Sequence, residues 1–405
     1  MTSTWPIRLL LAVCAVSMLL PLAGCWDIRY LDKLAVVLAI GVDDDPSGKY
    51  RYRLTVQIVL PQNATSTQKG REGSPVMTIS DTGDTMFEAI RKMSSKTSRR
   101  LFFSHTQLLV ISEKTAREGI YPLMDLIDRN ADIRTDIAVM IARDMEAQEL
   151  LEIRTQMESV PASQMKEMVS TNEVAQGQAY SVLVRDIARM ADSGLKQVAL
   201  PAVVAEGPIK AGNKNENVTN IKPEVIPEVR NMAVFKDGKL VHYLNARQSR
   251  GLAWLQEKLT STVVKLGCPG SDGFLMAEVI SSTTETKVKR SASDSETPVI
   301  ESQIRIEAAI HEMTCDFKLN GESALHEIEK LLNKTVEDEM RSTVQILQKL
   351  KIDTVGWAEA VYRDQPGLWE RISPRWSVMF PETEAKLECI SHVQSTGTRS
   401  NSIVK

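Results

Sequence analysis

The chain has 405 residues, of which 43% are hydrophobic and 25% are charged, and its formal net charge is −3. This composition is typical of a globular protein and excludes a disordered or fibrous chain. The length suits two or three domains, each large enough to bury a core of its own. The mildly acidic balance offers no basic footprint, so nucleic acid is not an expected partner.

The first 24 residues predict a signal peptide that is removed from the mature protein. Arg8 is the only charged side chain among them, and residues 9–20 are almost wholly apolar. Small residues stand just before Cys25, which is typical of a secretory cleavage site. Loss of Arg8 with this segment would change the net charge from −3 to −4.

An uncleaved transmembrane helix is the alternative interpretation of this segment. Residues 9–24 number only 16, whereas a membrane-spanning helix needs about 20. Pro21 interrupts the stretch, and no cluster of lysines and arginines follows it. No later stretch of the sequence is apolar for long enough to cross a bilayer, so the residues after Cys25 are expected in water outside the cytoplasm.

The segment ends in Leu22-Ala23-Gly24-Cys25, which resembles the lipobox of bacterial lipoprotein precursors. This resemblance implies cleavage after Gly24, a diacylglycerol on the Cys25 sulfur and an N-acyl chain. One acyl chain binds a membrane only marginally, whereas two hold a protein firmly. No cofactor other than this covalent lipid is expected. Trp26, next to the anchor, either lies at the membrane interface or packs in the core.

The mature chain opens with two strands that are predicted to form a hairpin. Residues 34–42 are an unbroken apolar run, which predicts a strand buried on both faces. Residues 51–60 alternate apolar and polar side chains, which predicts a half-buried strand. The polar, Pro- and Gly-containing residues 43–48 predict the turn between them.

Helices and strands are mixed from there to residue 206. Thr85 with Glu88 predicts a capping box that opens a helix ending near Met93. Hydrophobic periodicity predicts the other elements of this half. They are strands at 106–112, 135–142 and 197–204, a short helix that ends at Gly119, and helices at 123–129, 145–153, 162–169 and 181–190.

Residues 207–229 are rich in Gly and Pro and contain few large apolar side chains, which predicts a linker or long loop. The predicted domains are therefore an N-terminal region at 25–206 and a C-terminal domain at 230–395, with a flexible tail at 396–405.

The second half restarts with a hairpin around Asp237-Gly238 and a helix at 247–258. Its longest helical pattern is residues 323–351, where apolar side chains recur at three- and four-residue steps. Strands are predicted at 261–266, 274–284, 299–315 and 385–393. This mixture predicts an α+β fold with several domains.

Three cysteines besides Cys25 remain in the mature chain: Cys268, Cys315 and Cys389. A large domain does not need a disulfide, and Cys315 and Cys389 lie in strand-like stretches that favour small buried side chains. One disulfide among the three is the alternative.

No motif for catalysis or metal binding stands out, so an enzyme is not expected. His311-Glu312-Met313-Thr314-Cys315 begins like a zinc-protease motif, but Cys315 occupies the place of the second histidine, and the stretch is predicted as a strand. His105, beside Phe102 and Phe103, is interpreted as a structural histidine rather than a general base.

Several stretches carry a resemblance to a known family. They are Gly24-Cys25-Trp26-Asp27-Ile28-Arg29, residues 31–37, Ile40-Gly41-Val42-Asp43, residues 100–107, residues 233–240, Gly251-Leu252-Ala253-Trp254-Leu255, residues 347–353, Gly356, Trp369 and Trp376. In these stretches the chain resembles the Ger(x)C family, the lipoprotein C subunits of spore germinant receptors. The resemblance runs from the signal peptide to about residue 390.

This resemblance implies three mixed α/β domains and a non-catalytic subunit that spores need for germination. It also implies two integral membrane partners, an A subunit and a B subunit, in the inner membrane of the dormant spore. The chain would be anchored on the outer face of that membrane, where nutrients trigger germination. Trp26, Asp27 and Arg29 lie at the anchored end and are candidates to contact a partner or the membrane; alternatively, they cap the first strand.

A solute-binding lipoprotein of a transporter has the same kind of anchor and is the alternative function. It predicts two βαβ-rich lobes around a cleft. The hairpin at the start of the mature chain favours the receptor subunit instead.

Overall fold

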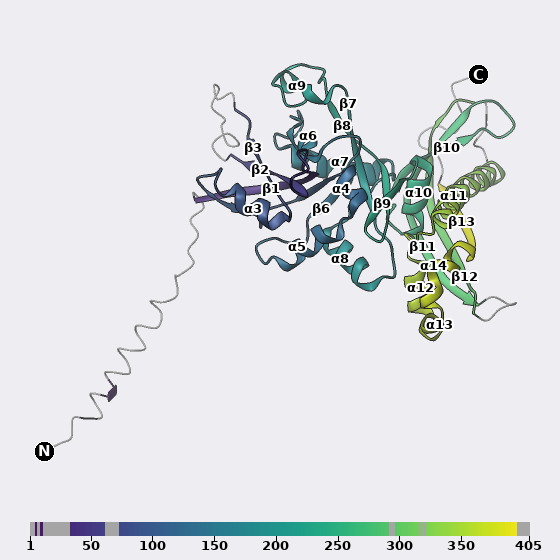
Figure 1. Cartoon of the computed structure of the whole chain (residues 1–405). Coiled ribbons are helices and arrows are strands. Elements are labelled where there is room, and N and C mark those ends of the chain that lie inside the picture. Colours follow the sequence, from purple (N-terminus) through teal and green to yellow (C-terminus); the bar gives the residue numbers. More distant parts are fainter. Residues whose placement is uncertain are drawn as a thin grey trace.

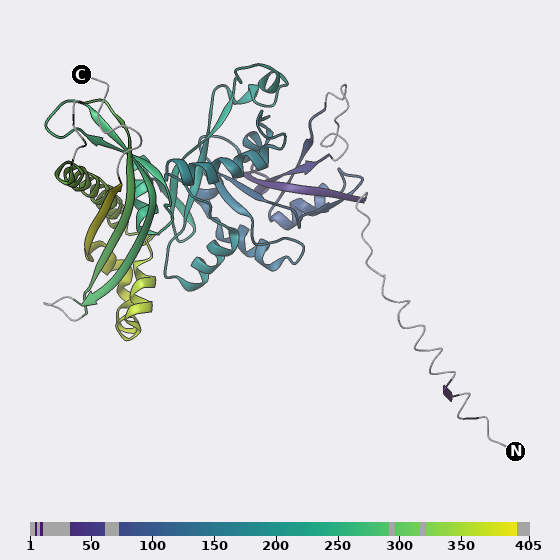
Figure 2. The same cartoon turned by 180° about the vertical axis from the view of Figure 1, so that it is seen from behind.

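The computed structural model describes residues 5, 9–10, 33–60, 73–290, 296–315, 317, 319 and 321–394. The described chain forms two lobes that lie next to each other, and the N-terminal end of β1 is at the end of the first lobe that faces away from the second (Figures 1 and 2). We call residues 33–244 the first lobe and residues 245–394 the second lobe. Each lobe contains one sheet and several helices.

The sheet of the first lobe has nine strands within the described residues, in the order β3-β2-β1-β5-β6-β7-β8-β9, with β4 paired to β1. The four central strands are parallel, and an antiparallel segment flanks them on each side. The strands are β1 (Leu34–Asp44), β2 (Tyr52–Val59), β3 (Val76–Gly83), β4 (Arg100–Phe102), β5 (Leu108–Ser112), β6 (Ala138–Ala142), β7 (Ala199–Glu206), β8 (Ile226–Lys236) and β9 (Lys239–Tyr243).

Helices cover the faces of this sheet, so its central strands are buried on both sides (Figure 1). Thr85 caps α3 by accepting the N–H of Glu88 at 3.1 Å, which is one half of the predicted capping box; the Glu88 carboxylate accepts the N–H of Asp84 at 2.9 Å instead of that of Thr85. The helices of the first lobe are α3 (Met86–Met93), α4 (Glu113–Glu118), α5 (Tyr121–Arg129), α6 (Ala147–Glu152), α7 (Pro161–Ala175), α8 (Val184–Ser193), η3 (Ile209–Ala211) and α9 (Glu216–Thr219).

The prediction that β2 is half-buried was wrong. Thr55 and Gln57, which were expected to face water, are fully buried. The Gln57 amide donates to the Leu151 carbonyl at 2.8 Å and accepts the N–H of Ala162 at 3.3 Å. Gln57 therefore packs under α6 and α7 and is satisfied by the backbone of these helices, while the Thr55 hydroxyl is hydrogen-bonded to the Ser80 hydroxyl of β3 at 2.8 Å.

Residues 207–229 connect two neighbouring strands of one sheet. Their last residues already belong to β8, whereas the sequence predicts a linker or long loop throughout. Within the loop, buried Asn217 donates to the carbonyls of Arg154 and Val225 and accepts the N–H of Val225. The sheet of the first lobe thus continues through β8 and β9, and the second lobe begins only with α10.

The second lobe has a four-stranded sheet within the described residues, in the order β10-β11-β12-β13. Its strands are antiparallel except for the parallel pair β12 and β13. Its elements are α10 (Ala246–Leu255), β10 (Thr262–Gly267), β11 (Phe274–Arg290), β12 (Pro298–Met313), α11 (Glu322–Leu350), α12 (Trp357–Asp364), α13 (Pro366–Ile372), η4 (Ser373–Arg375), α14 (Trp376–Met379), η5 (Phe380–Glu382) and β13 (Glu384–Gln394).

The 29-residue helix α11 packs on this sheet through the apolar stripe that the sequence predicts, from Leu332 to Leu347. α11 also protects the outer edge of the sheet. Its side chains Glu337, Asn333 and Glu329 accept the N–H groups of Cys389, Ser391 and Val393 in β13 at 2.8–3.0 Å. Side chains at four-residue steps on a helix therefore take up alternate N–H groups of a strand.

Helix α10 lies against α11 at Gly251, part of the Gly251-Leu252-Ala253-Trp254-Leu255 stretch that resembles the family. A Cβ atom at Gly251 would overlap the Glu339 carbonyl and the Thr343 hydroxyl. Next to this contact, the buried Glu339 carboxylate forms an ion pair with Arg250 and accepts the indole N–H of Trp254 at 3.2 Å. The glycine thus permits the close approach that this pair needs.

Gly251→Ala is expected to destabilise the protein by about 1–3 kcal/mol, because the added methyl group must push α10 away from the α11 backbone. Gly267→Ala is the matched control, since nothing lies within 4 Å of a Cβ atom there. Its effect should stay within about 0.5 kcal/mol. Urea unfolding of both variants measures the difference, and equal unfolding free energies would contradict the packing role of Gly251.

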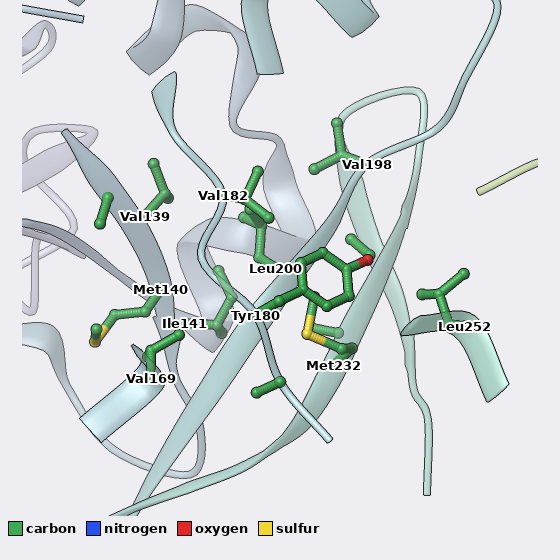
Figure 3. Packing of buried hydrophobic residues seen from close by; sticks show 14 of the residues in the cluster. Val139, Met140, Ile141, Val169, Tyr180, Val182, Val198, Leu200, Met232 and Leu252 are labelled. Atoms are coloured by element: carbon green, nitrogen blue, oxygen red, sulfur yellow. The ribbon is translucent and has the colours of Figure 1, made fainter. Parts of the chain in front are cut away.

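The two lobes share one continuous apolar core. Figure 3 shows the part of it where Tyr180 lies beside Met232, close to Leu252 of α10. The Tyr180 hydroxyl donates to the Gln256 amide oxygen at 2.8 Å, and the Gln256 amide donates to the Thr354 carbonyl at 2.5 Å. Apolar packing and a short polar chain therefore join the lobes.

The α+β, multidomain prediction is confirmed, although the described residues build two sheets and no third. The first lobe contains βαβ connections between its parallel strands β5, β6 and β7, but the second lobe does not, so the described chain is not the pair of βαβ-rich lobes that the solute-binding alternative predicts. In the described chain the first sheet begins and ends with antiparallel strands, and the second is mainly antiparallel.

Candidate functional site

The residues that the sequence predicts as functional are Gly24, Cys25, Trp26, Asp27 and Arg29, and all five lie outside the described residues. Lipidation, cleavage and partner contact at these positions stay predictions. What the structure does describe is the part of the fold that follows them directly, from Lys33 onward.

The outer end of the first lobe brings together two of the stretches that resemble the family. β4 runs parallel to the first residues of β1, with Leu34 opposite Arg100 and Val36 opposite Phe102. Beyond β4, the Thr106 hydroxyl donates to the Val37 carbonyl at 3.3 Å. The stretch at 100–107 therefore fixes the N-terminal end of β1, where the predicted anchor segment joins the fold.

His105 is exposed at this end, and its ring lies 5.5 Å from the Phe102 ring. Arg100 is also exposed and forms an ion pair with Asp132 at 3.5 Å. These side chains are available to a neighbouring protein or membrane surface, and the interpretation of His105 as structural stays a prediction.

Gly41 and Asp43, from the Ile40-Gly41-Val42-Asp43 stretch, both hold helix α6. The Asp43 carboxylate is buried and accepts the N–H groups of Ala147 at 2.6 Å and Gln148 at 3.0 Å. A Cβ atom on Gly41 would stand 2.9 Å from Leu151 of the same helix. The motif thus serves as a helix anchor, because a carboxylate at a helix N-terminus satisfies free N–H groups and complements the helix dipole.

Burial raises the pKa of the Asp43 carboxyl above its ordinary value, while the two backbone N–H groups and Arg53, 3.4 Å away, oppose the shift. The Asp43 oxygens are occupied by these partners. The geometry therefore supports a structural role for Asp43 and offers no free acid or base.

Asp353, at the end of residues 347–353, has the same role in the second lobe. Its buried carboxylate accepts the N–H groups of Gly356, Trp357 and Ala358 at 2.7–3.0 Å and the indole N–H of Trp376 at 3.0 Å. Burial raises the pKa of Asp353, against the effect of these donors. One side chain thereby joins the end of α11, the start of α12 and α14.

Two of the three cysteines in question form a disulfide. Cys268 and Cys315 are bonded, with their Cα atoms 6.5 Å apart, so the favoured interpretation of Cys315 as a free buried side chain was wrong; Cys389 is free and buried as the sequence predicts. Burial raises the pKa of the Cys389 thiol. β12 ends at Met313, so the first three residues of the zinc-protease-like stretch lie on a strand, and Thr314 and Cys315 follow it. Among the described residues, no three His, Cys, Asp or Glu side chains are placed to hold a metal ion.

Two open grooves lie on the first lobe. One, of about 790 Å³, lies between the start of β3 and the loop from α6 to α7; the other, of about 570 Å³, lies between α3 and α5. None of the described helices is long and apolar enough to span a bilayer.

Comparisons with known proteins agree with this architecture. Residues 27–205 match a family model described as "Spore germination protein N-terminal domain", and residues 230–397 match one described as "Spore germination B3/ GerAC like, C-terminal". A protein of Bacillus subtilis strain 168, "Spore germination protein KC", is 31% identical over 402 residues, which cover 98% of each chain. "Spore germination protein B3" of the same strain is 21% identical, over 94% of this chain and 96% of the relative.

A solved structure shares the fold. The crystal structure of the GerBC protein superposes with a TM-score of 0.54 and 18% sequence identity, covering 91% of this chain and 99% of that chain. At this level of identity the match concerns the fold alone. The identity to the KC protein over nearly the whole length, together with the two family models, shows that the chain belongs to the Ger(x)C family of spore germination proteins.

Proposed function

We propose that the chain is the lipid-anchored, non-catalytic C subunit of a nutrient germinant receptor. In this proposal it acts with integral membrane A and B subunits on the outer face of the spore inner membrane. The observation that carries the proposal is full-length similarity to a spore germination protein combined with a lipobox-like sequence at Cys25.

The geometry of the first lobe supports an anchor at its outer end. Lys33, the first residue described after Cys25, follows it by eight residues, which span at most about 27 Å when fully extended. β1 begins at the end of the first lobe that faces away from the second (Figure 1). The first lobe would therefore stay near the membrane, and the second would stand farther out.

An anchored subunit of this kind would act as an adaptor. Confinement to a surface raises its effective concentration near membrane partners without any new contact. The outer end of the first lobe, with exposed Arg100 and His105, is the surface we assign to these partners, together with Trp26, Asp27 and Arg29. The buried carboxylates of Asp43 and Asp353 fit the absence of catalysis in this proposal, since helix N–H groups occupy them.

Deletion of the gene should slow germination on one class of nutrient and leave vegetative growth and sporulation intact. The loss of optical density of purified spores on single amino acids, sugars and nucleosides measures the effect, and reintroduction of the gene at another locus is the control. Crosslinking of the tagged chain should recover two integral membrane proteins. Normal germination on every nutrient, in a strain without redundant receptors, would overturn the proposal.

A further inference from the structure

The cleft between the two lobes contains a cavity of about 220 Å³ that neither the anchor nor the helix caps use. Its walls come from both lobes: α8 and the loop before β7 on one side, and the end of α10 and α12 on the other. A second cavity of about 200 Å³ adjoins it and shares Lys196, Gln256 and Glu359. At about 30 Å³ per water, the first cavity has room for about seven waters or a small solute.

Three cations line this cavity: Arg189, Lys196 and Lys258. Within the described chain, none of their charged groups makes a hydrogen bond or an ion pair within 4 Å. Of the carboxylates in the wall, Asp186 already accepts the N–H of Leu183, and Glu359 lies beside the stem of Lys196 over Gly356. Asp353 is a third carboxylate that acts on Lys196, so cations and carboxylates are balanced in number, but none of the three carboxylates pairs with Lys196 within 4 Å.

Lys196 is the least exposed member of this group: it is partly buried, whereas Arg189 and Lys258 are exposed. Burial lowers the pKa of its ammonium group and Lys258 adds to this shift, whereas Glu359, Asp353 and Asp186 only partly oppose it. Removing a charged group from water without a close partner is unfavourable, so buried charges are normally paired. A small anion in the cavity would supply the missing partner.

We propose that this cleft binds a small anion that bears a carboxylate or a phosphate group, held by Lys196 with Arg189 and Lys258. An anion bound there would contact both lobes at once. It would therefore stabilise the arrangement in which α8 and α12 face each other, because a ligand favours the conformation to which it binds better. This inference concerns the fold itself and does not rest on the receptor proposal.

The test uses the full-length protein in detergent, with sodium phosphate and sodium acetate as separate probes and sodium chloride at equal ionic strength as the reference. The first readout is the rate at which an amine-reactive acylating reagent modifies Lys196, followed by mass spectrometry. With a probe at ten times its Kd, only about one site in eleven is empty, so modification of Lys196 should slow about tenfold. Lys210, an exposed lysine in the loop at 207–229, should be modified at an unchanged rate.

The second readout is the thermal unfolding midpoint. The effective probe should raise the midpoint of the native chain and of the Lys210→Met control, and should leave Lys196→Met unchanged. If Lys196→Met does not fold, Arg189→Gln should still show a weaker midpoint shift. Protection by phosphate alone assigns a phosphate-bearing ligand, and protection by acetate alone assigns a carboxylate.

Failure of both anions to protect Lys196 would overturn the inference. So would an equal loss of stability in Lys196→Met and Glu359→Gln without any effect of anions, since Lys196 and Glu359 would then be a structural pair.

Discussion

Cys25→Ala is expected to abolish incorporation of labelled fatty acid into the protein and to weaken nutrient-triggered germination strongly. The physical reason is that the Cys25 sulfur is the predicted attachment point of the diacylglycerol. Each buried methylene contributes about 0.8 kcal/mol to membrane binding, so loss of two chains removes most of the affinity. Metabolic labelling with a palmitate analogue, followed by membrane fractionation, measures both effects.

Cys14→Ala is the matched control, because Cys14 lies in the same N-terminal segment and is removed with the predicted signal peptide. This variant should be labelled and sedimented like the native protein. If Cys25→Ala is labelled to the native level, the anchor proposal is wrong, whereas the family assignment would stand on its own observations.

Asp353→Ala should have the largest effect on stability, a loss of roughly 3 kcal/mol or more. The change leaves the backbone N–H groups of Gly356, Trp357 and Ala358 and the indole N–H of Trp376 without their acceptor. A buried donor that loses its partner costs about 1–3 kcal/mol, although water that enters the space recovers part of this. Urea unfolding followed by tryptophan fluorescence measures the loss, because Trp357 and Trp376 lie at the site.

Asp338→Ala provides the comparison, since Asp338 is an exposed carboxylate on α11. It should change the unfolding free energy by no more than about 0.5 kcal/mol. Equal unfolding midpoints for the two variants would show that Asp353 does not hold α12 and α14 together.

Strong periodicity in the sequence predicts most of the regular elements correctly. The continuous apolar run of β1 and the long stripe of α11 each have one stable interpretation, and both are confirmed. The sequence does not indicate β3, because Val76–Gly83 contains few apolar residues and forms an exposed edge whose carbonyls at Ser80 and Thr82 bind Lys96 and Lys92. Its pairing with β2, rather than its own composition, makes it a strand.

The short helices α12, α13 and α14 are also not predictable from local sequence. Prolines interrupt this region, and each helix is too short to be stable alone. Contacts between distant aromatic side chains hold them: Trp357 and Trp376 pack against Phe380, and Trp369 packs edge-on against Trp376. Such contacts are visible only when the chain is folded.

Some of the candidate functional residues are likewise predictable from local sequence, and others only from the folded structure. The anchor prediction at Cys25 comes from local sequence alone and needs no fold. By contrast, the stretches around Asp43, Gly251 and Asp353 are identified in the sequence by their resemblance to the family, but the sequence does not show what these residues do in the fold. For Asp43 and Gly251 the reason lies in contacts with residues far along the chain, Ala147 and Glu339, whereas Asp353 mainly holds the backbone of the residues that follow it. The cationic cleft also joins residues from both lobes, so no single stretch of sequence could reveal it.

The α11 side chains that accept N–H groups of β13 would limit strand pairing between neighbouring copies of the protein if it is anchored to a membrane at high density. A strand with free N–H groups at the border of a sheet can recruit a strand from a neighbouring copy, which leads to aggregation. Tethering in two dimensions would bring many copies within reach of one another. Because Glu329, Asn333 and Glu337 already accept the N–H groups of Val393, Ser391 and Cys389, adjacent molecules would be less able to join through this part of the border if the chain is anchored as proposed.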